Sequence, residues 1–98
     1  MDITVQELKQ RMDAGEDNFV LLDVREPHER EEFNIGGLFI PMGTIPQRIA
    51  ELGDHREDEL IVYCRSGRRS ANVRNYLQQS GFSNVRNLEG GMLAWQEL

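Results

Sequence analysis

The sequence predicts a small α/β domain, with a central, mostly parallel sheet flanked by helices on both faces. Short, nearly all-apolar runs at residues 19–24, 38–40 and 60–63 alternate with segments of helical periodicity, and residues 85–88 are a fourth predicted strand. Such runs are typical of strands covered on both faces, and parallel strands need crossover helices between them. Because 98 residues suffice for one core and not for two, we expect a single domain over residues 1–98.

The first predicted helix lies close to the N-terminus. Thr4 and Glu7 form the capping-box pattern T-x-x-E, and apolar residues follow at helical spacing until Gly15, which suits a helix C-cap. The first strand comes next. Pro27 then favours the start of a short polar helix over residues 28–32, which we expect to form a solvated face.

The middle of the chain supplies the second and third strands and a short helix between them. The strand at 38–40 is closed by Pro41. Apolar residues spaced i, i+4 and i+7 over residues 45–52 predict an amphipathic helix. The charged residues 53–59 indicate a solvated loop, which leads into the strand at 60–63.

The last third of the chain predicts a longer helix, the fourth strand and a final short helix. Ser70 is a good N-cap for the helix over about 70–80, and Gly81 ends it. After the strand at 85–88, the pair Gly90-Gly91 turns the chain into the short helix. The residues that we expect to face the core from these two helices are Ala71, Val73, Tyr76, Leu77, Met92 and Trp95.

The composition excludes several classes of protein. Lys and Arg total 11 against 17 Asp and Glu, a formal charge of -6, which argues against general nucleic-acid binding. No apolar run approaches the roughly 20 residues of a membrane helix, and the start of the chain lacks the pattern of a signal peptide. The single cysteine excludes an internal disulfide and a multi-cysteine zinc site. We therefore expect a cytoplasmic protein without a metal or cofactor.

The most informative segment is the loop that follows the third strand. Cys64 comes directly after four apolar residues, and three arginines follow it before the next helix. In parallel sheets, ligands bind beyond the carboxyl ends of the strands, which is where this loop lies. Residues 64–69 carry a charge of +3, so the rest of the chain carries -9. A positive pocket on a negative protein suits a small anion or an ionised thiol rather than a polyanion.

The physical chemistry of this position favours a thiolate at Cys64. Lowering a cysteine pKa by two from its ordinary value near 8.5 takes roughly 2.7 kcal/mol. A helix N-terminus gives up to about 2 kcal/mol in a partly buried geometry, and backbone N–H groups and guanidinium charges can supply the rest. Gly67 lets the loop bend tightly around the sulfur.

A thiolate in such a loop can attack sulfur, phosphorus or arsenic, and the length of the loop discriminates among them. A phosphatase loop of the C-x5-R type needs arginine six positions after the cysteine, where this chain has Ser70. The last loop arginine is Arg69, five positions after the cysteine. The shorter cradle suits a sulfane sulfur atom better than a tetrahedral phosphate.

Four segments, in order, resemble the single-domain rhodaneses, which are sulfurtransferases. They are residues 22–26 (LDVRE), 64–70 (CRSGRRS), 81–85 (GFSNV) and 88–95 (LEGGMLAW), and together they span almost the whole chain. The resemblance implies a small α/β fold around a parallel sheet. It also implies that Cys64 takes sulfur from a donor such as thiosulfate, becomes a persulfide, and passes the sulfur to cyanide or a thiol.

One segment departs from the family pattern. Many members have G-H-I-x-G-A where this chain has FNIGGL at residues 33–38, without histidine. Rhodanese domains attached to cofactor-sulfurylating enzymes are similar in this respect. The departure concerns the subfamily and its partner more than the chemistry of the cysteine loop, because it lies outside that loop.

The site residues receive the following expected roles. Cys64 is the nucleophile and sulfur carrier, and Arg68 and Arg69 attract an anionic donor and steady the departing sulfite. The resemblance implies that Asp23 and Arg25 brace the active loop, and an ordinary structural ion pair explains these two residues equally well. The residues expected to form the anion cradle, mostly through backbone N–H groups, are Arg65, Ser66, Gly67, Arg68, Arg69 and Ser70.

The expected partners are a small anionic sulfur donor such as thiosulfate, and a thiol acceptor or sulfur-relay protein, with no nucleic acid and no membrane. Two alternatives stay open. One is a cysteine-dependent phosphatase or arsenate reductase of related fold, against which the loop length argues. The other is a non-catalytic rhodanese-like binding module, against which the intact cysteine and cradle argue.

Overall fold

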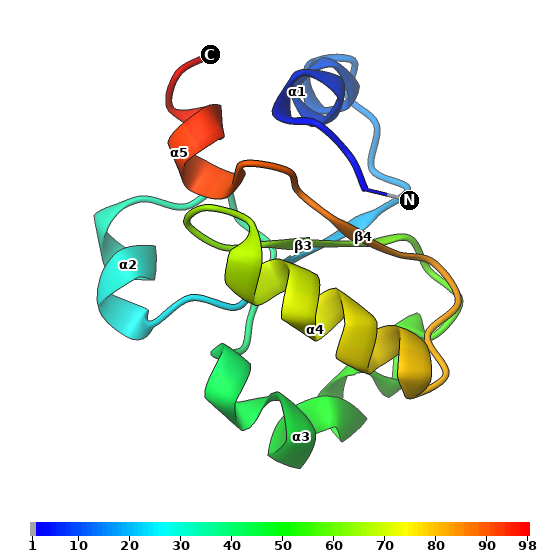
Figure 1. Ribbon diagram of the computed structural model, residues 1–98. Helices are drawn as coiled ribbons and strands as arrows, with labels where there is room; N and C mark the ends of the chain where they lie inside the picture. Colours follow the sequence, from blue (N-terminus) through cyan, green and yellow to red (C-terminus); the bar gives the residue numbers. More distant parts are fainter. Residues whose placement is uncertain (1) are drawn as a thin grey trace.

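A four-stranded parallel sheet forms the centre of the computed structural model, which describes residues 2–98 (Figure 1). Its strands are β1 (Val20–Asp23), β2 (Leu38–Phe39), β3 (Leu60–Tyr63) and β4 (Val85–Asn87). They are arranged in the order β2-β1-β3-β4, and every neighbouring pair is parallel. The predicted α/β fold with a parallel sheet is confirmed.

Helices cover both faces of this sheet (Figure 1). One face carries α1 (Val5–Asp13) and α5 (Gly91–Trp95), and the other carries α3 (Ile45–Arg48) and α4 (Arg68–Gln79). The short helix α2 (Pro27–Glu32) follows β1 and lies beside one end of the sheet. Among residues 2–98, no helix combines the length and apolarity that crossing a membrane requires.

The side chains of β3 alternate between two separate cores. Val62 and Cys64 belong to the core beneath α3 and α4, whereas Ile61 and Tyr63 belong to the core beneath α1 and α5. This alternation is the period of two that a strand covered on both faces produces. Because Cys64 continues β3 in the same phase as Val62, its side chain enters the layer that α4 covers.

The carboxyl ends of the strands meet at one edge of the sheet, where three segments converge (Figure 1). There β1 leads into α2, β3 leads into the loop at 64–67, and β4 leads into the turn before α5. Edges of this kind are where α/β sheets bind ligands. The fold therefore gathers the cysteine loop and two helix ends in one place.

Several element boundaries differ from those predicted. The longest helix, α4, begins at Arg68 rather than Ser70, because Gly67 occupies the N-cap in a left-handed conformation with φ +96°. Ser70 is consequently buried in the first turn of the helix. The helix predicted over 45–52 divides into α3 and the 3-10 helix η2 (Ile49–His55), which takes up part of the expected solvated loop.

The inward-facing residues of the last two helices are mostly as predicted. Val73, Leu77 and Met92 are buried, and Trp95 packs against the core while partly exposed. The prediction for Tyr76 is wrong, because its side chain is 39% exposed. The buried stripe of α4 runs through Val73 and Leu77, and Tyr76 lies to one side of it.

Candidate active site

The sulfur atom of Cys64 lies inside the loop that links β3 to α4. The backbone N–H of Gly67 donates to Sγ at 3.1 Å, and that of Ser70 donates at 3.4 Å. The hydroxyl oxygen of Ser70 lies 3.3 Å from the same sulfur. The whole Cys64 residue is buried. Polar hydrogens at the N-terminus of a 12-residue helix thus surround the sulfur, as they would surround a bound anion.

These donors outweigh the cost of burying charge at Cys64. Burial alone would raise the pKa of the thiol, because the charged form loses its hydration. Hydrogen bonds from the Ser70 hydroxyl and amide, and from the amides of Gly67 and Ser66, act in the opposite direction and bring the Cys64 pKa below its ordinary value. A lower pKa leaves more of the nucleophilic thiolate at neutral pH.

The loop is held in shape by α5, which packs directly against it. The backbone N–H groups of Met92 and Leu93 donate to the carbonyl oxygens of Cys64 and Arg65, both at 2.9 Å. This approach requires Gly91, since a Cβ on that residue would lie 2.4 Å from the Cys64 carbonyl oxygen. The glycine turn after β4 therefore positions the cysteine loop.

The arginines of the loop have different surroundings. Arg69 forms a bidentate ion pair with Glu29 of α2, with both N–O distances 2.8 Å. The Arg69 guanidinium lowers the pKa of the Glu29 carboxyl to about 2. Arg65 and Arg68 are exposed, and within residues 2–98 neither has an ion-pair partner. Arg68 therefore faces solvent, whereas the charge of Arg69 is already balanced.

The expectation that residues 28–32 form only a solvated face is wrong for Glu29. Its side chain is 16% exposed, because the carboxylate points toward the start of α4 and pairs with Arg69. Arg30, in the same segment, contacts the buried carboxylate of Asp23 at 3.3 Å. The polar helix thus contributes two charged side chains to the interior of the site.

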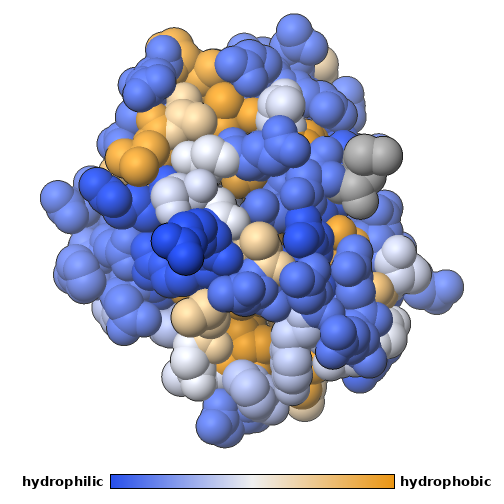
Figure 2. Space-filling model, in the orientation of Figure 1, coloured by the Kyte–Doolittle hydropathy of each residue, from blue (hydrophilic) through white to orange (hydrophobic). Residues whose placement is uncertain are grey.

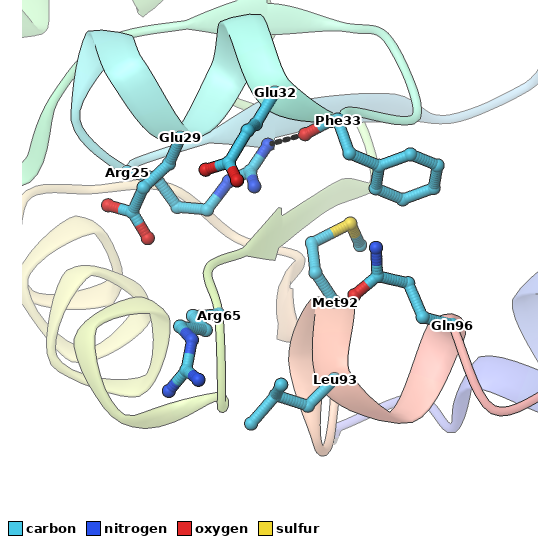
Figure 3. A pocket seen from close by; sticks show the side chains of 8 residues that line it. All are labelled: Arg25, Glu29, Glu32, Phe33, Arg65, Met92, Leu93 and Gln96. Atoms are coloured by element: carbon cyan, nitrogen blue, oxygen red, sulfur yellow. Dashed lines mark hydrogen bonds between the residues drawn. The ribbon is translucent and has the colours of Figure 1, made fainter.

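Asp23 and Arg25 form a buried ion pair at the end of β1. Two guanidinium nitrogens of Arg25 donate to the Asp23 carboxylate, each at 2.9 Å. Arg25 also donates to the carbonyl oxygen of Phe33 at 2.7 Å (Figure 3). These contacts fix α2 and the residue that follows it against the sheet. The pair therefore supports the wall of the site that α2 forms.

A pocket of about 280 Å³ opens between α2, the cysteine loop and α5 (Figure 3). Arg65 lies on the loop side, Met92 and Leu93 come from α5, and Glu32 and Phe33 come from the end of α2. Hydrophobic surface gathers over α5 in the space-filling view (Figure 2). The pocket thus combines a free cation beside the cysteine loop with apolar side chains of α5 and acidic side chains of α2.

Two residues of this arrangement were not predicted. Asn87 of β4 is buried and contacts both Ser70 and Gly67. An amide side chain inside an otherwise buried strand was the available signal for it. Glu29 had no such signal, because nothing in the sequence distinguishes it from the neighbouring acidic residues. Among residues 2–98, no three His, Cys, Asp or Glu side chains gather into a group that could hold a metal ion.

Comparison with known proteins identifies the family. Residues 4–98 match the family model of the rhodanese-like domain. YtwF of Bacillus subtilis is 42% identical over 97% of this chain and 89% of its own length, and a protein of Allochromatium vinosum named "Sulfurtransferase" is 40% identical over 96% and 86%. The crystal structure of a rhodanese-like domain protein from Staphylococcus aureus has a TM-score of 0.85 and 33% identity, over 97% of this chain and 91% of that one. The chain therefore belongs to the rhodanese-like domain family.

Proposed function

We propose that this protein is a thiosulfate sulfurtransferase in which Cys64 carries the transferred sulfur as a persulfide. The observation that carries the proposal is the set of hydrogen bonds from Gly67 and Ser70 to the Cys64 sulfur. The relative from Allochromatium vinosum, named as a sulfurtransferase and 40% identical, supports the same assignment. The donors stabilise a thiolate, which is the form of cysteine that attacks sulfur.

In the first step, the Cys64 thiolate attacks the outer sulfur of thiosulfate. A bond forms between Sγ and that sulfur, and the bond between the two thiosulfate sulfurs breaks. Sulfite leaves with the electron pair, and the outer sulfur carries the negative charge of the new persulfide. No general base is needed, because the attacking sulfur is already ionised.

Before the second step, the outer sulfur of the persulfide takes a proton from water. The thiolate of an acceptor then attacks this protonated outer sulfur. The new bond joins the acceptor sulfur to the outer sulfur, and the bond to Sγ breaks. The electron pair returns to Sγ, so the Cys64 thiolate is restored and the acceptor leaves as a persulfide. The hydrogen-bond donors around Sγ favour this step because they stabilise the leaving thiolate.

The geometry of the loop favours sulfur chemistry over phosphoryl or arsenate chemistry. Ser70 stands at the position where a C-x5-R phosphatase loop has its arginine. The Ser70 side chain is buried and contacts the Cys64 sulfur and Asn87, so the position holds a hydroxyl and no cation. The loop therefore lacks the bidentate cation that would hold a phosphate dianion.

The sulfur donor is assigned to the exposed arginines of the loop, and the acceptor is assigned to the pocket. Arg65 and Arg68 are the cations that attract thiosulfate, since Arg69 is paired with Glu29. The pocket between α2 and α5 receives the acceptor, a thiol on a small molecule or on a sulfur-relay protein. Neither nucleic acid nor a membrane enters the proposal.

The proposal is tested by mass spectrometry of the reduced protein after incubation with thiosulfate at neutral pH. We expect a gain of about 32 mass units on Cys64, release of sulfite, and loss of the added sulfur on treatment with a thiol. Cys64→Ser is the control and should gain nothing. An unmodified Cys64 in the reduced protein contradicts the proposal, and hydrolysis of an aryl phosphate that requires Cys64 would favour the phosphatase alternative. A Cys64 pKa at its ordinary value would favour the non-catalytic alternative.

A further inference from the structure

Behind the cysteine loop, a buried amide side chain contacts the two residues that bind the sulfur. Asn87 of β4 is 6% exposed, and its Nδ2 donates to the carbonyl oxygen of Gly67 at 3.2 Å. The Ser70 hydroxyl donates to its Oδ1 at 2.5 Å. The same hydroxyl oxygen lies 3.3 Å from the Cys64 sulfur. Asn87 therefore reaches the sulfur only through other residues.

The orientation of the Asn87 amide is dictated by its neighbours. The carbonyl oxygen of Gly67 can only accept a hydrogen bond, so the NH₂ group must face it. The amide oxygen is then left facing Ser70 and can only accept. Asn87 thus presents a fixed hydrogen-bond acceptor to the Ser70 hydroxyl.

The Ser70 hydroxyl has one hydrogen and two acceptors that compete for it. When Sγ is uncharged, the hydroxyl donates to the Asn87 oxygen, which would otherwise be buried without a partner. When Sγ is a thiolate, the hydroxyl is drawn to the sulfur, because hydrogen bonds to a charged acceptor are the stronger ones. The hydroxyl therefore has two positions, and the charge on the sulfur selects between them.

We propose that Asn87 is a positioning residue that holds the Ser70 hydroxyl away from Cys64 while the sulfur is uncharged and releases it when the sulfur becomes a thiolate. The inference deepens the proposed function and rests on it for its use in sulfur transfer. In the persulfide, Sγ carries no charge, and the hydroxyl stays with Asn87. As the outer sulfur leaves, charge returns to Sγ and the hydroxyl turns toward it.

Asn87 also limits how strongly the loop stabilises the thiolate. When the hydroxyl turns toward the sulfur, the Asn87 oxygen loses its hydrogen-bond partner. The free-energy cost of leaving that buried oxygen unpaired opposes ionisation of Cys64. A thiolate that is stabilised too strongly is a weaker nucleophile, since nucleophilicity falls with the pKa of the thiol. The competition thus keeps Cys64 both ionised and reactive.

The experiment is a double-mutant cycle read out by the pKa of Cys64, measured from thiolate absorbance and from alkylation rate against pH. Asn87→Leu removes the acceptor at similar size, and we expect the thiolate-to-thiol ratio at a given pH to rise about tenfold, a pKa about one unit lower. In a Ser70→Ala background, Asn87→Leu should leave the Cys64 pKa unchanged, because Asn87 influences Cys64 only through the Ser70 hydroxyl.

Other groups near the sulfur do not obscure this titration. Arg69 of α4 interacts electrostatically with Cys64, and its partner Glu29 of α2 has a pKa of about 2. Both keep their charges between pH 5 and 9, roughly the range in which a perturbed cysteine titrates. The remaining contacts to the sulfur come from the neutral groups of Ser66, Gly67 and Ser70.

Two outcomes of the cycle overturn the inference. One is an unchanged or higher Cys64 pKa in Asn87→Leu. The other is an equal shift in the Ser70→Ala background, which would mean that Asn87 acts through the Gly67 carbonyl and the shape of the loop. If Asn87→Leu does not fold, Asn87→Ala takes its place in the cycle.

A measurement on the parent protein needs no substitution of Asn87. The side-chain amide resonances of Asn87 should shift along the Cys64 titration in the parent and stay constant in Ser70→Ala. Constant resonances in the parent contradict the inference. No sulfur donor is present in any of these measurements, so failure of the Asn87 inference and failure of the proposed function are distinguishable.

Discussion

The ion pair between Glu29 and Arg69 should stabilise the fold in a way that depends on pH. Its two contacts of 2.8 Å lower the pKa of the Glu29 carboxyl from its ordinary 4.5 to about 2. At 1.36 kcal/mol for each pKa unit, this corresponds to at most about 3.4 kcal/mol. Arg69 is 30% exposed and Glu29 16%, so solvent screening reduces the contribution to about 1 kcal/mol.

The sign of the pH dependence follows from the direction of the shift. A carboxyl whose pKa is lowered on folding contributes its stabilisation fully above pH 4.5 and loses it as the pH falls toward 2. In the parent, the Glu29 carboxylate accepts a hydrogen bond from the Glu26 backbone N–H at 3.0 Å. Glu29→Gln removes the charge but keeps a side-chain oxygen that can accept this hydrogen bond. The substitution should therefore cost about 1 kcal/mol at pH 7 and less than half of that at pH 3.

Urea unfolding of parent and Glu29→Gln at pH 7 and pH 3 measures this difference. The control is Glu51→Gln, which breaks a similar bidentate pair with Arg48 on an exposed surface away from the site. Glu51→Gln should lower the free energy of unfolding by less than Glu29→Gln does. A cost for Glu29→Gln that is the same at both pH values, or no greater than that of the control, refutes the reasoning.

Glu29→Gln should also free Arg69 and lower the KM for thiosulfate roughly two- to fivefold at low salt, and 0.5 M salt should remove this effect. An unchanged KM would show that Arg69 does not face the donor. Arg68→Glu should lower kcat/KM for thiosulfate severalfold and leave the urea midpoint unchanged, because the side chain is exposed. Gly91→Ala should cost at least about 2 kcal/mol of folding free energy, since the added Cβ meets the Cys64 carbonyl oxygen at 2.4 Å, and chemical unfolding measures it. Glu59→Gln should cost about 1–3 kcal/mol at pH 7 and less below pH 4.5, because the Arg11 guanidinium lowers the Glu59 pKa to about 2; a cost that does not vary with pH contradicts this assignment.

The sequence predicted β1, β2 and β3 well because each is short, mostly apolar and bounded by polar turns. The N-cap of α1 was equally clear, and the Thr4 hydroxyl oxygen does accept the Glu7 backbone N–H at 3.1 Å. The start of α4 was misplaced because Ser70 is a good N-cap by residue type. The structure uses Gly67 instead, and Ser70 is needed inside the helix, where its hydroxyl reaches the Cys64 sulfur.

The contacts between distant segments could not be predicted in the same way. Glu29 and Arg69 are 40 positions apart, and Ser70 and Asn87 are 17 apart. Local periodicity carries no information on such pairs, because it describes which face of an element is buried and not which side chain meets it. A polar residue in a buried strand is the exception, since burial requires a partner. For Asn87, the need for a hydrogen-bond partner could have indicated that its side chain contacts a neighbouring segment.

The cysteine loop therefore depends on more than its own seven residues. Within residues 64–70, the chain supplies the amides that contact the sulfur. The carbonyl oxygens of Cys64 and Arg65 are held from outside by amides of α5, and the carbonyl oxygen of Gly67 is held by Asn87 of β4. Without α5, the carbonyl oxygens of Cys64 and Arg65 would lose these hydrogen-bond partners. The segments around 64–70 and 88–95 thus act as one unit, since the second fixes the backbone through which the first stabilises a thiolate.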